Sequence, residues 1–440
     1  MPAPSRPISC HPAGRPGGRL RARRRFAGRL AALALAPALG RAKTDTPRSI
    51  TVAAFPAVDE MVRAAIPAFR ARRPEVEVRV VSRQFADHHT AMTTALSTSF
   101  HLPDVMALEV GYVGRFARGG GLENLAGEPY RIRRFEPRFV AYAFRQATAR
   151  DDAVVAAPLD IGPGTLLYRH DLLQRAGLAE RDLTHSWDGF VAAGVRLRST
   201  TGAHLVAHAR EVKDILIRTG VQPGEGLYFD ERSRVLVDTP RFARAFEVAR
   251  QVRRQRLDGR LAAWSNEWSE AFRRGTLATQ MSGAWLAGHL SNWLAPSTRG
   301  LWRAAPLPGG SAAAFGGTFL AIARGAAAAN KQLAWEFIEL MTLARDVQLA
   351  SFKKHDAFPA LLDCHDDPFF EAPLAFLGEQ PARTLWRDTA RRIQAVAVHK
   401  QDAFASEVID TELDKVLDRG KDIPQALSDA ARLLARRATR

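Results

Sequence analysis

Cysteine is almost absent from the sequence, which contains only Cys10 and Cys364 in 440 residues. Cys10 lies in the first 42 residues, which we interpret below as a leader, so we expect one cysteine and no internal disulfide in the mature chain. Cys10 also precedes the apolar part of that leader, which is the wrong position for a lipid-anchoring cysteine. A free protein whose stability comes from packing is therefore expected.

Motifs of common enzymes and cofactor sites are also missing. The sequence has no Gly-x-Ser-x-Gly, Gly-x-x-x-x-Gly-Lys-Ser/Thr, His-Glu-x-x-His or Cys-x-x-Cys. Residues 363–367 (DCHDD) include metal-ligand types, but adjacent side chains do not easily converge on one ion, so we predict a surface turn. His88-His89 is likewise interpreted as a solvated pair on a helix. We expect no catalysis, cofactor or metal, although two carboxylates far apart in the sequence would escape a motif search.

Long apolar runs and a basic stripe are absent too. No segment is long enough to span a bilayer as a helix. The formal charge is +17, but residues 1–42 hold nine arginines and no acidic residue, and without them the charge falls to +8. In the rest of the chain basic and acidic residues alternate, without the aromatic-lined basic groove that nucleic acids need. We therefore expect no nucleic-acid partner.

Residues 1–42 have the three-part layout of an export signal. RARRRFAGR is positive, LAALALAPALG is apolar, and Gly40-Arg41-Ala42 places small residues at both contact positions of a cleavage site. Arg23-Arg24-Arg25-Phe26 fits the twin-arginine pattern, which directs export of folded proteins. The alternative is a basic tail followed by a short helix. The export interpretation predicts a soluble periplasmic protein.

After the leader, strand and helix patterns alternate. Strands are predicted at residues 49–55, 76–82, 104–110, 154–159, 165–168, 277–281, 302–305 and 317–323. Helices are predicted at residues 59–72, 87–100, 171–176 and 187–198 and from Thr239-Pro240 onward, and the last 110 or so residues are predicted to be mostly helical. Over residues 49–110, the order strand, helix, strand, helix, strand predicts an α/β layer with largely parallel strands.

Six segments in order resemble the extracellular solute-binding protein family 1, the sugar-binding components of ABC transporters that include maltose- and glycerol-phosphate-binding proteins. The segments are residues 102–106 (LPDVM), 111–125 (GYVGRFARGGGLENL), 157–178 (APLDIGPGTLLYRHDLLQRAGL), 272–290 (FRRGTLATQMSGAWLAGHL), 302–322 (WRAAPLPGGSAAAFGGTFLAI) and 330–342 (NKQLAWEFIELMT). Each is weak alone, and the third, fourth and fifth are the most specific. Together they touch most of residues 48–345.

The resemblance implies a periplasmic binding protein type II-like fold, with two α/β lobes, a hinge and a ligand cleft between the lobes. Residues 43–158 plus 306–350 would form the N-terminal lobe. Residues 159–305 plus 351–440 would form the C-terminal lobe with a helical tail. The implied protein is a monomer that delivers its ligand to the permease subunits of an ABC importer in the inner membrane.

Trp285 is the first ligand-binding candidate. It follows the predicted strand at residues 277–281 and the small residues Ser282-Gly283-Ala284, at a corner where a ligand can approach the backbone. An indole can cover the C–H face of a sugar, and the resembling family places a stacking tryptophan here. The alternative is a core residue between helix and sheet.

Carboxylates can accept hydrogen bonds from neighbouring sugar hydroxyls. Asp160 follows the strand-like VVAAPL, and Glu109 ends DVMALEV, with Tyr112 shortly after it. We predict that all three contact ligand. The alternatives are a helix N-cap for Asp160, a salt bridge to an arginine for Glu109 and a core aromatic for Tyr112.

Phe55, the Phe315-Gly316-Gly317 segment and Trp264 complete the predicted site. Phe55 ends the first strand, and Phe315-Gly316-Gly317 precedes the last, with Phe315 facing Trp285 across the sugar. Trp264, in AAWSNEW, is a weaker candidate, because a helix cap packing its own face explains it equally well.

The predicted function is a periplasmic substrate-binding component of an ABC importer for a sugar or sugar-like polyol, without catalysis. One alternative is a secreted glycoside hydrolase with Glu109 and Asp160 as its acid/base pair. Another keeps the fold but binds glycerol phosphate, for which no arginine or lysine can be assigned to the cleft, or a polyamine. Iron capture is disfavoured because the five tyrosines are scattered.

Overall fold

The computed structural model describes residues 48–118, 120–149, 152–396 and 398–438. The predicted export signal at residues 1–42 lies outside the described residues. In the described part, no helix is long and apolar enough to cross a membrane.

The first part of the chain follows the predicted alternation. Its elements in order are β1 (Arg48–Ala54), α1 (Val58–Arg72), β2 (Val76–Ser82), α2 (Phe85–Thr98), β3 (Val105–Glu109) and α3 (Val110–Arg118). Strands β2, β1 and β3 are neighbours and run parallel, as the strand–helix–strand order predicts. Helix α1 continues through Pro67, which does not end it.

The second half of the sheet is antiparallel and rests on two long strands, β4 (Ala157–Arg169) and β7 (Ala314–Ile322). The sheet order is β2-β1-β3-β7-β4-β5, with β5 at Thr279–Gly283 and β6 (Trp302–Ala305) also paired to β4. The prediction of separate strands at 154–159 and 165–168 is wrong, because β4 is continuous through Gly162-Pro163-Gly164. The first half of β4 pairs with β7, and the second half pairs with β5 and β6. Pairing before and after the two glycines keeps this segment of the backbone extended.

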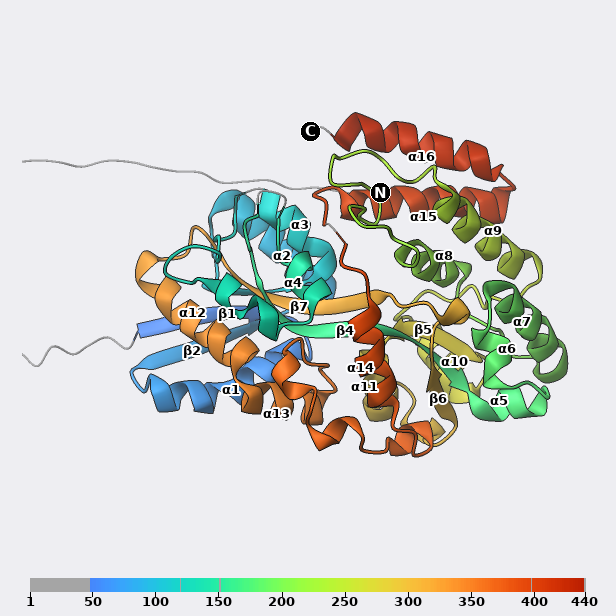
Figure 1. Ribbon diagram of the computed structural model, residues 1–440, viewed down its shortest axis with the longest axis horizontal. Helices are drawn as coiled ribbons and strands as arrows, with labels where there is room; N and C mark the ends of the chain where they lie inside the picture. Colours follow the sequence, from blue (N-terminus) through green and yellow to red (C-terminus); the bar gives the residue numbers. More distant parts are fainter. Residues whose placement is uncertain (1–47, 119, 150–151, 397, 439–440) are drawn as a thin grey trace, which may run out of the picture. The chain divides into compact units, whose positions relative to one another are not determined.

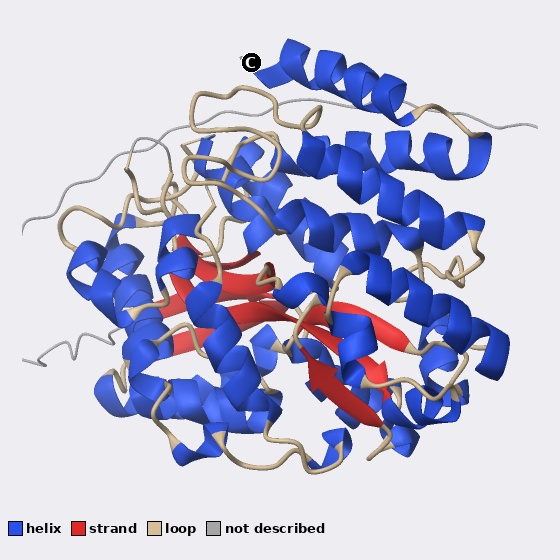
Figure 2. Cartoon of the chain, turned by 45° about the vertical axis from the view of Figure 1, so that its right-hand side comes forward, coloured by secondary structure: helices blue, strands red, loops and turns tan. Residues whose placement is uncertain are grey.

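Helices surround this sheet (Figures 1 and 2), with α1, α12 and α13 in one layer and α2 and α3 in another. The longer remaining helices are α7 (Trp187–Thr201), α8 (Ala209–Arg218), α9 (Pro240–Arg254), α10 (Asn266–Arg274), α12 (Ala328–Leu343), α13 (Arg345–His355), α14 (Ala382–Arg392), α15 (Asp402–Arg419) and α16 (Ile423–Ala438). The shorter ones are α4 (Ala141–Gln146), α5 (His170–Arg175), α6 (Glu180–Thr184) and α11 (Trp285–His289). The tail is helical, as predicted.

Two main hydrophobic clusters form the core. The first gathers β1, β3, α1 and α12 and also includes Phe352 and Trp386 of the tail. The second gathers α7, α8 and α9 with Leu413 and Leu427 of α15 and α16. The C-terminal tail is therefore divided between the two cores, and the lobe boundaries remain a prediction.

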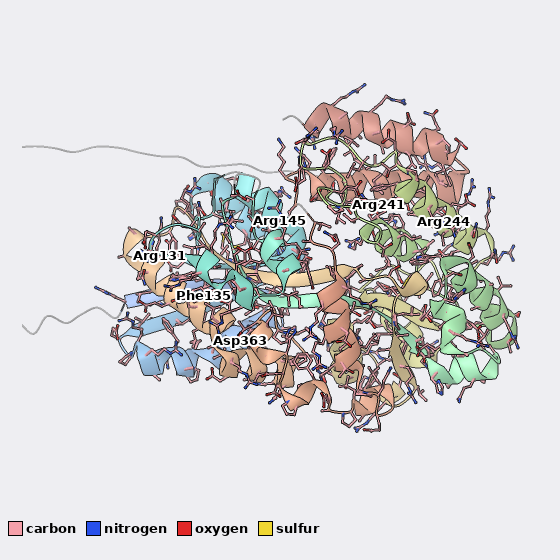
Figure 3. The ribbon with its side chains drawn as sticks, in the orientation of Figure 1. Arg131, Phe135, Arg145, Arg241, Arg244 and Asp363 are labelled. Carbon is pink, nitrogen blue, oxygen red and sulfur yellow. The ribbon has the colours of Figure 1, made fainter. Side chains whose placement is uncertain are left out.

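Basic side chains lie on separate elements and are commonly paired with acids. Figure 3 shows labelled arginines spread over several elements. Arg145 lies 3.3 Å from Glu231, and Arg244 lies 2.6 Å from Asp188. Such surface pairs contribute little stability each, but they neutralise much of the positive charge locally.

Candidate functional site

Two carboxylates flank β7 at the same level. Glu109, the last residue of β3, is paired in register with Thr318 of β7, and Asp160 of β4 is paired with the same threonine from the other side. Directly opposed residues in a sheet share a face, and neighbouring strands lie about 4.8 Å apart. The ladder has register shifts on both sides of Asp160, and such irregularities often re-aim a side chain next to a binding site. Two acidic groups separated by more than 50 residues thus meet at one place.

Hydrogen bonds orient both carboxylates. The backbone N–H of Gly111 donates to Glu109 Oε2 at 2.8 Å, and the N–H of Thr318 donates to Asp160 Oδ1 at 3.1 Å. The alternative of a helix N-cap for Asp160 is wrong, since it lies within a strand. Within the described chain, neither carboxylate forms an ion pair within 4.0 Å.

The electrostatic surroundings favour the neutral acids. Burial, together with a smaller effect of Asp160, raises the pKa of Glu109 to about 7, although the Gly111 N–H and Arg218 oppose the shift. Burial also raises the pKa of Asp160 to about 6, although the Thr318 hydrogen bonds oppose this. Arg218, the last residue of α8, also lies over the Phe315 ring at 5.1 Å. An arginine therefore lies near Glu109, where the sequence alone could not assign one.

An aromatic group adjoins Glu109. The Tyr112 ring stacks on His89 at 3.9 Å between centroids, and His89 Nε2 accepts a hydrogen bond from the Glu109 backbone N–H at 3.2 Å. Phe55, at 9% exposure, is buried beside His89, whereas neighbouring Phe85 is 43% exposed. The predicted ligand contact of Phe55 remains a proposal, and Phe85 has the more accessible ring.

The prediction that His88 and His89 are solvated is wrong, because both are buried. His88 Nε2 bonds the Ala107 carbonyl at 2.7 Å, and His89 Nδ1 bonds that of Phe85 at 2.8 Å. Adjacent helical positions are about 100° apart, so a wide buried face can include both. Burial lowers the pKa of His89 to about 4, so it is neutral at neutral pH.

Trp285 begins α11 directly after β5 and is partly buried. Its Nε1–H donates to the Phe315 carbonyl at 2.9 Å. A Cβ added to Gly283 would lie 2.3 Å from Trp285 Nε1, and one added to Gly162 would lie 2.0 Å from the Phe315 oxygen. The small residues at this corner thus make room for the indole edge. Trp285 packs at the edge of the first core without being enclosed by it.

The Phe315-Gly316-Gly317 segment connects Trp285 to the carboxylates. Gly316 has a φ of 82° and Gly317 a φ of 131°, which side-chain-bearing residues rarely adopt. The partly buried Phe315 ring packs against the second core and lies under Arg218. The contact found between Phe315 and Trp285 is the carbonyl hydrogen bond, and the predicted placement of a sugar between their rings remains a proposal.

Trp264 lies beside Trp285, with ring centroids 6.0 Å apart and planes 15° from parallel. Its neighbour Trp268 is buried and donates to Gln280 Oε1 at 3.1 Å. Two of the predicted tryptophans therefore come together, and the Trp268 ring contacts Trp264 with centroids 5.2 Å apart.

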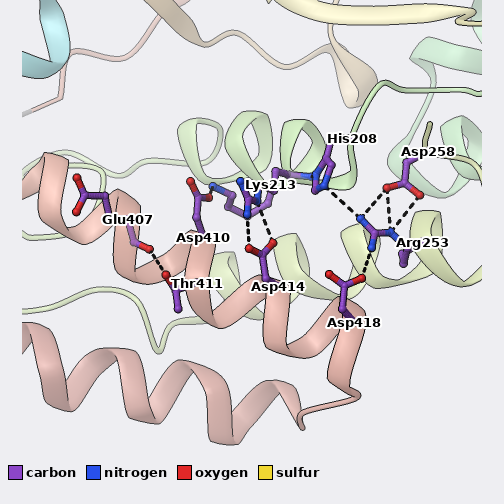
Figure 4. Close-up of polar contacts among 10 residues, drawn as sticks. His208, Lys213, Arg253, Asp258, Glu407, Asp410, Thr411, Asp414 and Asp418 are labelled. Atoms are coloured by element: carbon purple, nitrogen blue, oxygen red, sulfur yellow. Dashed lines mark hydrogen bonds and ion pairs between the residues drawn. The ribbon is translucent and has the colours of Figure 1, made fainter. Parts of the chain in front are cut away.

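The α8 helix that carries Arg218 is held by charge pairs to α15. Figure 4 shows the aspartates of α15 facing α8 and α9. The pairs are Lys213–Asp410, Arg210–Asp414 and Arg253–Asp418. Lys213 is fully buried, and its Nζ lies 2.5 Å from Asp410 Oδ1. The aspartates recur every fourth residue, a spacing that places them on one helix face.

The structure thus brings most predicted residues into one neighbourhood. Glu109, Asp160 and the Phe315–Gly317 segment adjoin directly, Trp285 joins through its hydrogen bond, and Tyr112 joins through His89. Arg218 and His89 were missed. The sequence gives only a weak indication of either residue, because a basic residue at a helix end and a histidine on a helix face are common on ordinary protein surfaces.

Within the described residues, no group of three or more histidine, cysteine or acidic side chains is arranged to hold a metal ion. The run at residues 363–367 does form a turn, but Cys364 and His365 are buried rather than at the surface, with His365 Nε2 bonding the Pro359 carbonyl at 3.0 Å.

Residues 64–377 match the model of the bacterial extracellular solute-binding protein family. The chain belongs to this family. The resemblance predicted from the six segments is confirmed, and the family is one of binding proteins. No curated protein matches the sequence at a significant level.

Solved structures of solute-binding proteins share the fold. A crystal structure of an extracellular solute-binding protein of family 1 has a TM-score of 0.77 at 22% identity and covers 90% of this chain and 100% of its own. The ABC transporter-associated binding protein of B. animalis subsp. lactis, in complex with β-1,6-galactobiose, gives 0.75 at 18% identity, with 89% and 98% covered. Maltose-bound MalE3 of T. maritima gives 0.72 at 20% identity, with 88% and 99% covered. The predicted α/β solute-binding fold is thereby confirmed.

Proposed function

We propose that this protein is the substrate-binding component of an ABC importer and binds a sugar or sugar-like polyol beside Trp285. The observation that carries the proposal is the convergence of one partly exposed indole with two carboxylates, neither of which is ion-paired to any of the described residues. An indole offers a flat apolar surface, and carboxylates accept hydrogen bonds from hydroxyls, a combination that suits a sugar. The galactobiose and maltose complexes of structural relatives support the same ligand class.

Binding without catalysis is part of the proposal. The family is one of binding proteins. Glu109 and Asp160 are nevertheless two acids on one sheet face, so hydrolysis must be tested directly. We expect no reducing-sugar release over time from any glycan that binds. Release that disappears in Glu109→Gln or Asp160→Asn would replace the proposal with the hydrolase.

The ligand class is tested by thermal shift and calorimetry on the chain without residues 1–42. The panel holds mono- and disaccharides, glycerol phosphate and polyamines, with Trp285→Ala as the matched variant. A ligand at 100 times its Kd stabilises the folded state by about 2.7 kcal/mol. We expect at least one sugar to do so in the wild type and much less in Trp285→Ala. No stabilisation by any sugar or polyol in well-folded protein would contradict the proposal.

A phosphorylated polyol is the second candidate, because Arg218 lies near Glu109 and over Phe315. An arginine guanidinium binds phosphate in bidentate geometry. If the ligand is phosphorylated, Arg218→Gln abolishes binding of glycerol phosphate. If the ligand is a neutral sugar, the phosphate ester does not compete with it.

Periplasmic location, a monomeric state and delivery to permease subunits in the inner membrane complete the proposal. Cell fractionation with and without Arg23→Lys and Arg24→Lys tests twin-arginine export. Light scattering tests the monomer, and loss of ligand uptake on gene deletion tests delivery.

A further inference from the structure

Three tryptophans form a connected row that starts at Trp285. Trp264 lies against Trp285 at 6.0 Å and against Trp293 at 6.4 Å, with planes 15° and 18° from parallel. These distances and angles are those of offset-stacked rings. We call Trp285, Trp264 and Trp293 the tryptophan ladder.

The outer two members contribute little to the core. Trp264 is 55% and Trp293 is 52% exposed, the two most exposed tryptophans among the large hydrophobic residues of the described chain. Because hydrophobic stabilisation is proportional to the apolar area removed from water, an indole exposed to this extent gives up about half of what it can supply. Adjoining exposed aromatic rings more often mark a binding surface than a packing requirement.

The backbone at both outer members is irregular. Trp264 has a φ of 70°, a left-handed conformation that is uncommon for a bulky residue and costs on the order of 1–3 kcal/mol. Trp293 lies in a π-helical turn, Leu290–Leu294, and such turns are rare and frequently found at functional sites. Two independent irregularities therefore present the two exposed indoles.

His289 holds the ladder in place. Its ring lies edge-on to all three indoles, at 5.5 Å from Trp285, 5.9 Å from Trp264 and 5.7 Å from Trp293. Trp293 Nε1–H donates to His289 Nδ1 at 2.9 Å, and burial lowers the pKa of His289, so that nitrogen stays an acceptor at neutral pH. A surface fixed in this way loses little conformational entropy when a ligand binds.

The ladder leads from the Trp285 site to a pocket. The pocket has a volume of about 720 Å³ and includes Trp293 in its lining. Its wall combines apolar and polar side chains, among them Leu261, Asn266, Glu267, Glu270 and Arg273. Carboxylates, amides and guanidinium groups supply both acceptors and donors for hydroxyls, and the volume lies in the range of small-molecule sites.

We propose that the ligand is an oligosaccharide that extends from the Trp285 site along the tryptophan ladder to this pocket. The inference rests on the proposed function and names its substrate class. A glycan presents C–H faces at regular intervals along its chain, and the ring spacings of the ladder are comparable with the length of one sugar unit. A monosaccharide or a small polyol would leave Trp264 and Trp293 unused, and a polyamine has no flat apolar face to lay on them.

Calorimetry with glycans of increasing length tests the inference. The probes are α-1,4-linked glucose chains and β-1,6-linked galactose chains of one to five units, measured on wild type and on Trp293→Ala, Trp293→Phe and Phe100→Ala. Phe100 is 70% exposed and lies outside the ladder, so its variant controls for loss of an exposed aromatic. For one of the two glycan series, we expect the affinity of the wild type to rise with the number of sugar units. Trp293→Ala should then weaken the longest chains about 5- to 20-fold and leave the disaccharide within 2-fold, while Trp293→Phe recovers part of the loss.

Each other outcome is decisive. Disaccharide binding without any gain from longer chains overturns the inference and leaves the proposed function standing. An equal loss at every length in Trp293→Ala, or equal behaviour of Trp293→Ala and Phe100→Ala, also overturns it. Normal glycan binding with impaired uptake in Trp293→Ala would assign the exposed indoles to a protein partner instead. Binding of no glycan of any length overturns both the inference and the proposed function.

Discussion

Replacement of Glu109 by glutamine separates the cost of the buried acid from its use in binding. The pKa of Glu109 is raised from an ordinary 4.5 to about 7 by burial and by Asp160. An acid whose pKa is higher in the folded than in the unfolded state stabilises the fold fully below the unfolded pKa, and this contribution is lost as pH rises through the folded pKa. Stability of the ligand-free protein should therefore fall between about pH 4.5 and 7.

The size of the effect follows from the shift. Each pKa unit corresponds to 1.36 kcal/mol, so the shift sets an upper bound of about 3 kcal/mol. The side chain is not fully buried, and it titrates together with Asp160, so we expect about 1–3 kcal/mol. Glu109→Gln resembles the protonated acid. It should match the wild type near pH 4.5 and exceed it by this amount at pH 8.

Urea unfolding at pH 4.5, 6 and 8 measures this difference, and Glu371→Gln, at an exposed position, is the control. Ligand binding should show the opposite trend, because the ionised acid accepts hydroxyl hydrogen bonds. Sugar affinity of the wild type should rise from pH 5 to pH 8, while that of Glu109→Gln should stay weak and nearly constant. The same pH slope of stability in Glu109→Gln and wild type would refute the reasoning.

Trp285→Ala should reduce sugar affinity about 10- to 100-fold in calorimetry while the fold persists, and an unchanged affinity would remove the indole from the site. Gly283→Ala should weaken binding and lower stability by about 1–3 kcal/mol, because the added Cβ would lie 2.3 Å from Trp285 Nε1. Gly127→Ala is the control, since no atom lies within 4 Å of its added Cβ. Equal effects of the two substitutions would argue against a steric cause. Lys213→Met should cost about 3–5 kcal/mol in urea unfolding, because it leaves Asp214 and Asp410 without their buried cation. Less than 1 kcal/mol would mean that water already screens this pair.

Short-range sequence patterns predicted the features that depend on neighbouring residues. The alternation over β1 to β3 followed from short-range periodicity, and the Trp285 corner followed from a strand, three small residues and a helix. The position of Glu109 at the end of a strand was also predicted correctly, whereas Asp160 was predicted to follow a strand and lies within β4. Ligand contact by either residue remains a prediction. A local sequence pattern does not predict which distant segments pair. The hydrogen bond from Trp285 to the Phe315 carbonyl joins two such segments, so it could not be predicted.

The errors in the prediction have the same origin. β4 was divided because glycine and proline ordinarily interrupt strands, and only β5, β6 and β7, all far along the chain, hold it continuous. His88 and His89 were assigned to solvent because polar residues usually face it, whereas β3 supplies the Ala107 carbonyl that satisfies His88. Arg218 could not be assigned, because its relation to Glu109 depends on how α8 packs against α15.

The energetics of Glu109 and Asp160 differ from those of an ion-paired surface carboxylate. A structural carboxylate is stabilised by a partner that lowers its pKa, as Arg73 does for Glu336. Glu109 and Asp160 show the opposite, since burial raises the pKa of both. Their hydrogen bonds to Gly111 and Thr318 offset that cost only in part, so the fold holds two acceptors beside an indole at a loss of stability. A hydroxyl-rich ligand would satisfy these acceptors, and its binding free energy would include recovery of that loss.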